Sequence, residues 1–160
     1  MDVKAIDIAV PEGCNVVVGQ AHFIKTAEDL AEIVVTTVPD AGFGLAFCEA
    51  SGPCLIRTEG NDSHLIQAAA DAASAVGAGH SFFLFLKNAF PINLLDRIKN
   101  CQEVARVFCA TANPLQILIV TTGQGAGIVG VVDGASPKGV ESEKDRTARR
   151  ELLRKFGYKF

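Results

Sequence analysis

The sequence contains no tryptophan, one tyrosine and one methionine. Its hydrophobic segments are short and are interrupted by glycine, proline or charged residues, whereas a membrane-spanning helix needs about 20 consecutive apolar residues. The first residues, MDVKAIDIAVPEG, place charges among the apolar positions, where a secretory signal peptide has an unbroken apolar core. We therefore expect a cytoplasmic protein without a membrane partner.

The cysteine content argues against a disulfide framework and against a zinc site. Five cysteines are present, an odd number, and none of them forms a C-x-x-C pair. The phosphate-binding loop G-x-x-x-x-G-K-[ST] is also missing, which excludes a conventional P-loop kinase.

The net charge of −3 is unevenly distributed along the chain. From Lys138 to the last residue there are eight basic and four acidic residues, so the rest of the chain carries about −7. A basic C-terminus can meet phosphate or nucleic acid, but no basic stripe interleaved with aromatic residues accompanies it. We interpret this segment as a solvated helix and expect no nucleic-acid partner.

The hydrophobic pattern predicts one domain of the α+β class. Nearly half of the 160 residues are hydrophobic, which allows a substantial core, so we expect a single domain over residues 1–160. Strand-turn-strand patterns surround PEGCN, SGP and TANP, and helical patterns cover about residues 26–38, 62–76 and 142–156, with a short helix from Pro91. Hairpins mixed with helices predict a mixed β-sheet, with the helices packed mainly on one face.

Single residues mark the expected helix ends. Thr26 is expected to cap the N-terminus of the first helix, and Asn61 or Asp62 that of the second. Gly77 suits the left-handed position just past the second helix.

Residues Gly125 to Gly130 match the dinucleotide-binding motif G-x-G-x-x-G. In a dinucleotide-binding fold that motif must open a helix, so that the helix N-terminus meets the pyrophosphate. Here Val131 and Val132 follow and lead into Asp-Gly, which is typical of a strand that ends in a turn. We therefore interpret the motif as part of a glycine-containing hairpin.

His80 is the strongest candidate for chemistry among the three histidines, His22, His64 and His80. The glycines before it allow other groups to approach the ring, and a strand end beside a helix terminus is a common place for an active site. A histidine nitrogen can attack a phosphorus centre. From these residues alone two interpretations stay open, a nucleophile or a structural histidine at the start of a buried strand.

Other polar residues lie at strand ends and in turns. Glu49 and Asp133 end two predicted strands, where a carboxylate can hold Mg²⁺ or accept a substrate proton, although Asp-Gly is also a frequent turn pair. Lys87 ends the strand that follows His80, and phosphoryl transfer needs cations or backbone N–H groups around the phosphoryl oxygens. The remaining candidates of this kind are Ser51, Asn88, Asn113 and Lys138.

Six stretches together carry a family resemblance: FGLAFCEASGP, RTEGND, GHSFFLFLKNAFPINLLDRIKN, FCATANP, GIVGVVDGASPKGVE and RRELLRKFGYKF. They resemble the adenosine-specific kinase family, a small archaeal and bacterial family once classed as a domain of unknown function, and the resemblance covers essentially the whole chain. Members of that family are α+β proteins that assemble as oligomers, bind adenosine and adenine nucleotides, and carry an unusually stable phosphohistidine. The resemblance implies that His80, in the G-H-S-F stretch, is the phosphorylated residue.

The first functional hypothesis is therefore an enzyme. ATP with Mg²⁺ would phosphorylate His80, and the phosphoryl group would pass to a hydroxyl of adenosine, giving AMP. His80, Asp133 and Lys87 are the predicted catalytic residues, and Asp133 is also the predicted metal ligand. The predicted substrate-binding residues are Glu49, Ser51, Asn88, Asn113 and Lys138.

The second hypothesis is a regulatory module. It would bind adenine nucleotides and hold the phosphohistidine as a stored modification without significant turnover. A dinucleotide-dependent redox enzyme is a third reading, but it rests only on the glycine motif. In the first two cases the resemblance implies a homo-oligomer, in which the basic C-terminal helix can serve as an interface.

Overall fold

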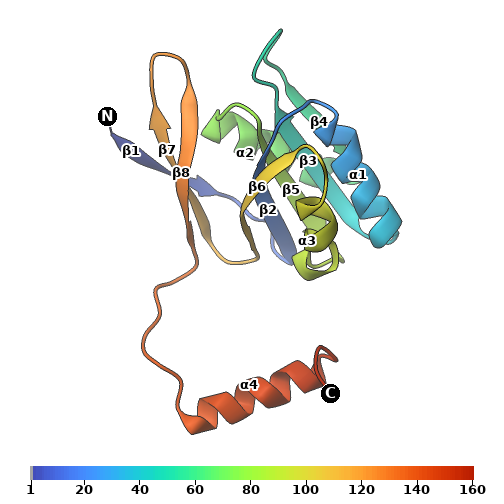
Figure 1. Ribbon diagram of the computed structural model, residues 1–160, viewed down its shortest axis with the longest axis vertical. Helices are drawn as coiled ribbons and strands as arrows, with labels where there is room; N and C mark the ends of the chain where they lie inside the picture. Colours follow the sequence, from blue (N-terminus) through green and yellow to red (C-terminus); the bar gives the residue numbers. More distant parts are fainter. Residues whose placement is uncertain (1) are drawn as a thin grey trace.

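The computed structural model describes residues 2–160, which form eight strands and four helices (Figure 1). The strands are β1 (Val3–Ile8), β2 (Cys14–Ala21), β3 (Gly42–Cys48), β4 (Ile56–Gly60), β5 (Ser81–Lys87), β6 (Val104–Thr111), β7 (Leu115–Thr121) and β8 (Ala126–Asp133). The helices are α1 (Thr26–Thr37), α2 (Ser63–Val76), α3 (Pro91–Lys99) and α4 (Glu143–Lys155).

Five strands form the larger sheet, in the order β4-β3-β5-β2-β6. All its neighbouring strands are antiparallel. Each of α1, α2 and α3 connects two strands of the same direction, but one antiparallel strand lies between those two in the sheet. The central strand, β5, is buried from Ser81 to Leu86, so both faces of this sheet are covered.

Helices α1 and α3 cover one face of the larger sheet. Leu30 and Val34 of α1 and Leu94 and Ile98 of α3 pack there against the side chains that β3, β5 and β2 point to that face. These four side chains are fully buried and recur at helical spacing, which is the pattern of a helix with one buried side.

Helix α2 and a second sheet cover the other face. The second sheet is antiparallel, in the order β1-β7-β8, and its residues Ile8, Leu115 and Ile117 share a core cluster with α2 and with the larger sheet. On this face β3 presents Gly44 and Ala46, small residues that let α2 approach closely.

The α+β class predicted from the sequence is confirmed, with two differences in arrangement. The strands form two antiparallel sheets instead of one mixed sheet, because an antiparallel strand separates every pair of strands that a helix connects. The helices cover both faces instead of one, because β5 is apolar on both sides and needs cover on both.

The helix ends were predicted well at α2 and less well at α1. The Asp62 side chain accepts hydrogen bonds from the backbone N–H groups of His64 and Leu65, and Gly77 ends α2 in the left-handed conformation. Thr26 was expected as a cap, but it lies inside α1, and its hydroxyl donates to the carbonyl of Phe23.

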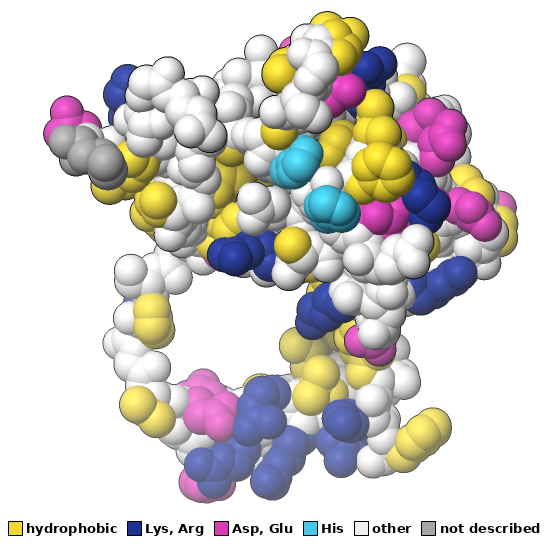
Figure 2. All heavy atoms as spheres, turned by 45° about the horizontal axis from the view of Figure 1, so that its top comes forward, with side chains coloured by type: hydrophobic (Ala, Val, Ile, Leu, Met, Phe, Trp, Pro, Cys, Tyr) yellow, Lys and Arg dark blue, Asp and Glu magenta, His cyan; other side chains and the backbone are white. Residues whose placement is uncertain are grey.

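The C-terminal arm, which we define as residues 134–160, lies apart from the two sheets (Figure 1). It consists of a linker and α4, which begins with a capping box between Ser142 and Asp145 and has no buried residue. Lys and Arg side chains gather over this arm (Figure 2). Within residues 2–160, none of the helices is both long and apolar enough to cross a membrane.

Candidate active site

The backbone of His80 is held between two strand ends of the larger sheet. Its N–H donates to the carbonyl of Cys48 at 2.7 Å, and its carbonyl accepts from the N–H of Ala21 at 2.9 Å. Its φ of 62° is left-handed, a conformation that few residues other than glycine adopt, although histidine is among those enriched there. Such conformations persist where surrounding bonds impose them, and they cluster at functional sites.

The imidazole of His80 stacks on a buried aromatic ring and is partly exposed. Its centroid lies 5.7 Å from that of Phe47, with 21° between the ring planes, and Phe47 is fully buried. No hydrogen bond joins the imidazole to another residue within the described range 2–160. The ring is therefore positioned by stacking, and its nitrogens are not committed to another protein group.

A cavity of about 850 Å³ opens beside His80. It has the size of a small-molecule pocket. Four segments line it: Gln20 of β2, the chain from the end of β3 to the start of β4, the end of α2 up to His80, and the β7–β8 hairpin. The loop between β3 and β4 and the tip of the β7–β8 hairpin project from the same end of the molecule (Figure 1).

The glycine motif is a hairpin, as the sequence predicted, but it also belongs to this cavity. Gly125 and Gly127 line the wall made by the β7–β8 hairpin. An isolated parallel bridge between Ala78 and Ala126 ties this hairpin to the segment just before His80. Sequence reasoning missed this neighbourhood, because pairing between residues 78 and 126 leaves no local signal.

Glu49 is the predicted substrate-binding residue that the structure brings to His80. It lines the same cavity, and its carboxylate accepts hydrogen bonds from the backbone N–H of Leu55 at 3.1 Å and from the guanidinium of Arg57 at 3.0 Å. The hydrogen bond from the Leu55 N–H and, to a smaller extent, the guanidinium of Arg57 hold the pKa of Glu49 below its ordinary value. Ser51 lies in the turn two residues further on and is exposed.

Lys87 and Asn88 lie at the opposite end of β5 from His80. A seven-residue strand separates them from His80 by roughly 20 Å. Lys87 is exposed and lies opposite Cys14 of β2 and Gly42 of β3 in the sheet. Asn88 has a left-handed φ of 57°.

Asp133 and Asn113 form a polar group at that far end. The Asp133 carboxylate accepts from the Thr111 hydroxyl at 2.6 Å and from the Asn113 amide at 3.2 Å. Asp133 ends β8, whereas the His80 cavity lies at the start of that strand. Lys138 is exposed in the C-terminal arm. Within one chain the structure thus brings Glu49 to His80 and Asn113 to Asp133, and the roles of all these residues stay predictions.

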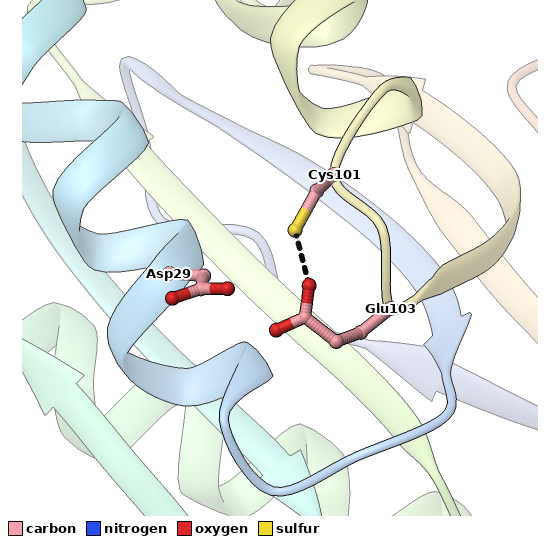
Figure 3. A group of neighbouring side chains, drawn as sticks. All are labelled: Asp29, Cys101 and Glu103. Atoms are coloured by element: carbon pink, nitrogen blue, oxygen red, sulfur yellow. Dashed lines mark hydrogen bonds between the residues drawn. The ribbon is translucent and has the colours of Figure 1, made fainter.

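A second cluster of titratable side chains lies between α1 and the turn after α3 (Figure 3). Cys101 donates from its thiol to the carboxylate of Glu103 at 3.0 Å, and Lys25 forms ion pairs with both Asp29 and Glu103. Burial raises the pKa of Glu103, but its interactions with Asp29, Cys101 and Lys25 outweigh burial and lower that pKa to about 2. Burial and Glu103 raise the pKa of Cys101 to about 11, so this thiol is a poor nucleophile.

We expect Glu103→Gln to lower the free energy of unfolding by roughly 1–3 kcal/mol at neutral pH, because a buried carboxylate loses charge-assisted hydrogen bonds. The pKa of Glu103 is about 2 in the folded chain and near 4.5 otherwise. Its stabilisation is therefore complete above pH 4.5 and is lost as the pH falls towards 2. Asp29, whose pKa Glu103 raises, offsets part of this effect.

Chemical denaturation of wild type and Glu103→Gln at neutral pH and near pH 3 measures this contribution. The matched control is Glu32→Gln, an exposed glutamate of α1 that lines the same surface hollow as Asp29 and Glu103 and should change stability little. Equal free energies of unfolding for wild type and Glu103→Gln at neutral pH would contradict the expected role. A difference that stays as large near pH 3 as at neutral pH would contradict it too.

Comparison with known proteins assigns the chain to a protein family. The family model described as adenosine specific kinase matches residues 6–159. No curated protein matches the chain. The crystal structure of the PH1918 protein from Pyrococcus horikoshii OT3 superposes with a TM-score of 0.95 at 44% sequence identity, over 99% of this chain and 98% of that one. The chain therefore belongs to the adenosine specific kinase family.

Proposed function

We propose that this protein is an ATP-dependent adenosine kinase that transfers phosphate through a phosphohistidine at His80. The observation that carries the proposal is the imidazole of His80, which is fixed by stacking on Phe47 beside a cavity of about 850 Å³. The description of the family supports adenosine as the acceptor.

The proposed reaction has two displacements at phosphorus. A nitrogen of His80 attacks the γ-phosphorus of ATP, an N–P bond forms, and the bond to the bridging oxygen breaks as ADP leaves with the electron pair. A hydroxyl oxygen of adenosine then attacks the same phosphorus, the N–P bond breaks, and AMP forms. The hydroxyl proton passes to the imidazole of His80, whose nitrogen is released as the N–P bond breaks.

Phosphate in this cavity needs a source of positive charge. Among the described residues that line the cavity, none is lysine or arginine. Mg²⁺ is commonly held by one or two carboxylates together with substrate phosphates, and Glu49 is the one carboxylate among the described residues that line the cavity. When bound, Mg²⁺ would balance the charge of the phosphates. Asp133, the ligand predicted from the sequence, lies at the other end of β8.

A homo-oligomer is part of the proposal, because Lys87, Asp133 and Lys138 could reach His80 only from a neighbouring copy. An open hollow of about 630 Å³ separates Tyr158 of the C-terminal arm from α3. Exposed side chains with apolar surface border it on both sides, with Tyr158 48% exposed on the arm and Ile92 63% exposed on α3. Phe156, two residues before Tyr158, is 60% exposed. The positive arm and the negative remainder of the chain give two copies complementary charge.

Removal of one apolar side chain from the arm should weaken this assembly. We expect Phe156→Asp to shift the protein towards a smaller mass in sedimentation equilibrium, compared with the wild type. Thr147→Asp is the control, since it adds the same charge nine residues away, on the opposite side of α4. A wild-type mass equal to one chain would refute the assembly itself.

The function is tested by incubating the wild type with ATP and Mg²⁺, followed by a chase with adenosine. An acid-labile phosphoryl adduct in the intact mass that disappears as AMP forms would support the kinase. An adduct that persists through the chase would favour the regulatory reading, in which the phosphohistidine is a stored modification. If neither an adduct nor AMP forms, both the kinase and the regulatory hypothesis are refuted.

A further inference from the structure

Gly125 and Gly127 are glycines that the folded chain itself does not require. Gly77 needs to be glycine for its left-handed φ of 61°, and Gly44 because a Cβ would lie 2.0 Å from the backbone of α2. At Gly125 and Gly127 the φ angle is outside the left-handed range, and a Cβ would meet no atom within 4 Å. Gly127 lies in β8, where a glycine weakens a strand by roughly 0.5–1 kcal/mol, and Gly125 lies in the loop just before that strand, so the folded chain gives neither position a reason to be glycine.

Both glycines lie in the wall of the His80 cavity. Ala126, which lies between the two glycines, forms a β-bridge with Ala78, two residues before His80. The bridge therefore holds both glycines close to the segment that carries His80. Glycine in a strand often marks a place where a ligand approaches the backbone closely. The cavity is the ligand site of the proposed function, so a ligand is available to make that approach.

The rim of the cavity indicates which part of the ligand lies here. Leu55 is 52% exposed, Ile56 37% and Val129 58%, and all three border the cavity. A flat apolar ring would cover these side chains, whereas a phosphate would not benefit from them. The described hairpin residues that line the cavity carry no charge, which favours the uncharged part of a nucleotide beside them.

We propose that Gly125 and Gly127 are specificity-determining residues, against whose backbone the nucleoside part of the substrate lies directly. The inference rests on the proposed function and adds the part of the cavity wall that contacts the nucleoside. A methyl group at either position would occupy space that the nucleoside needs, while it would cost the empty protein nothing.

Adenosine binding measured by calorimetry tests this assignment. We expect Gly125→Ala and Gly127→Ala to weaken the affinity for adenosine at least about tenfold, with an unchanged or raised thermal unfolding temperature. Gly127→Val should weaken binding further and favour the strand conformation of β8. Gly123→Ala is the control: Gly123 lies in the same hairpin with equally free space, but it is not in the cavity wall.

The outcomes separate this inference from the proposed function. Wild-type affinity for adenosine in Gly125→Ala, Gly127→Ala and Gly127→Val would overturn the role of the glycines and leave the kinase proposal standing. Weaker binding in Gly123→Ala by the same factor would also overturn it, since the effect would then belong to the hairpin as a whole. A wild type that binds no adenosine would overturn both.

Discussion

Replacement of His80 by alanine is expected to abolish the phosphoryl adduct and to reduce AMP formation by roughly 10³-fold or more, as loss of a nucleophile does in other covalent enzymes. The fold should survive. The imidazole is partly exposed and makes one aromatic contact, with Phe47, which contributes about 0.5–1.5 kcal/mol. Both hydrogen bonds that hold this position come from the backbone, and alanine keeps them.

His80→Asn refines the test, because the backbone at residue 80 has a φ of 62°. Alanine in this conformation costs about 1–2 kcal/mol, whereas asparagine tolerates it and still offers no nucleophilic nitrogen. His64→Ala is the control, an exposed histidine in the first turn of α2. Intact mass after incubation with ATP, together with AMP formation, reports the effect. An adduct of normal yield in His80→Asn would show that another residue is phosphorylated.

Features that depend on residues close in sequence could be predicted. The cap at Asp62 and the left-handed Gly77 follow from local chemistry, and the structure has both. Pro91 begins α3, and the residues after Gly125 form a strand, as their β-branched side chains indicated. Each of these depends on a few neighbouring residues, so a single sequence carries the signal.

Features that depend on strand pairing could not be predicted. Lys87 and His80 are near in sequence, but a strand places them at opposite ends of the sheet. Asp133 and Gly127 lie in one strand, and only Gly127 lines the His80 cavity. The sequence shows that the strand after His80 is apolar, but it does not show which strands pair with it or that both of its faces are covered. The cover on both faces and the composition of the site both follow from that pairing.

The largest effect on stability is expected at Gly44, where α2 packs directly on β3. A Cβ at this position would lie 2.0 Å from the carbonyl carbon of Leu65 and 2.2 Å from the nitrogen of Ile66. Both atoms belong to the helix backbone, so no side-chain rotation relieves the clash and α2 would have to move away. Leu65 and Ala69 of α2 would then lose their core contacts.

We therefore expect Gly44→Ala to lower the free energy of unfolding by roughly 3 kcal/mol or more, a large part of the 5–15 kcal/mol typical of a domain. Gly42→Ala is the matched control. It lies on the same strand and the same face, and its Cβ would be 3.5 Å from the nearest atom, an ordinary contact. Denaturation curves of the two variants and the wild type give the difference. Equal stability of the two variants would mean that α2 can shift at little cost.

The same substitution connects the core to the site. Helix α2 ends at Val76, and the segment after it carries His80 and the bridge from Ala78 to Ala126. A movement of α2 away from β3 would therefore displace one wall of the His80 cavity. If Gly44→Ala still folds at low temperature, we expect its affinity for adenosine to fall together with its stability. Gly42→Ala should keep both, because it leaves the contact between α2 and β3 intact.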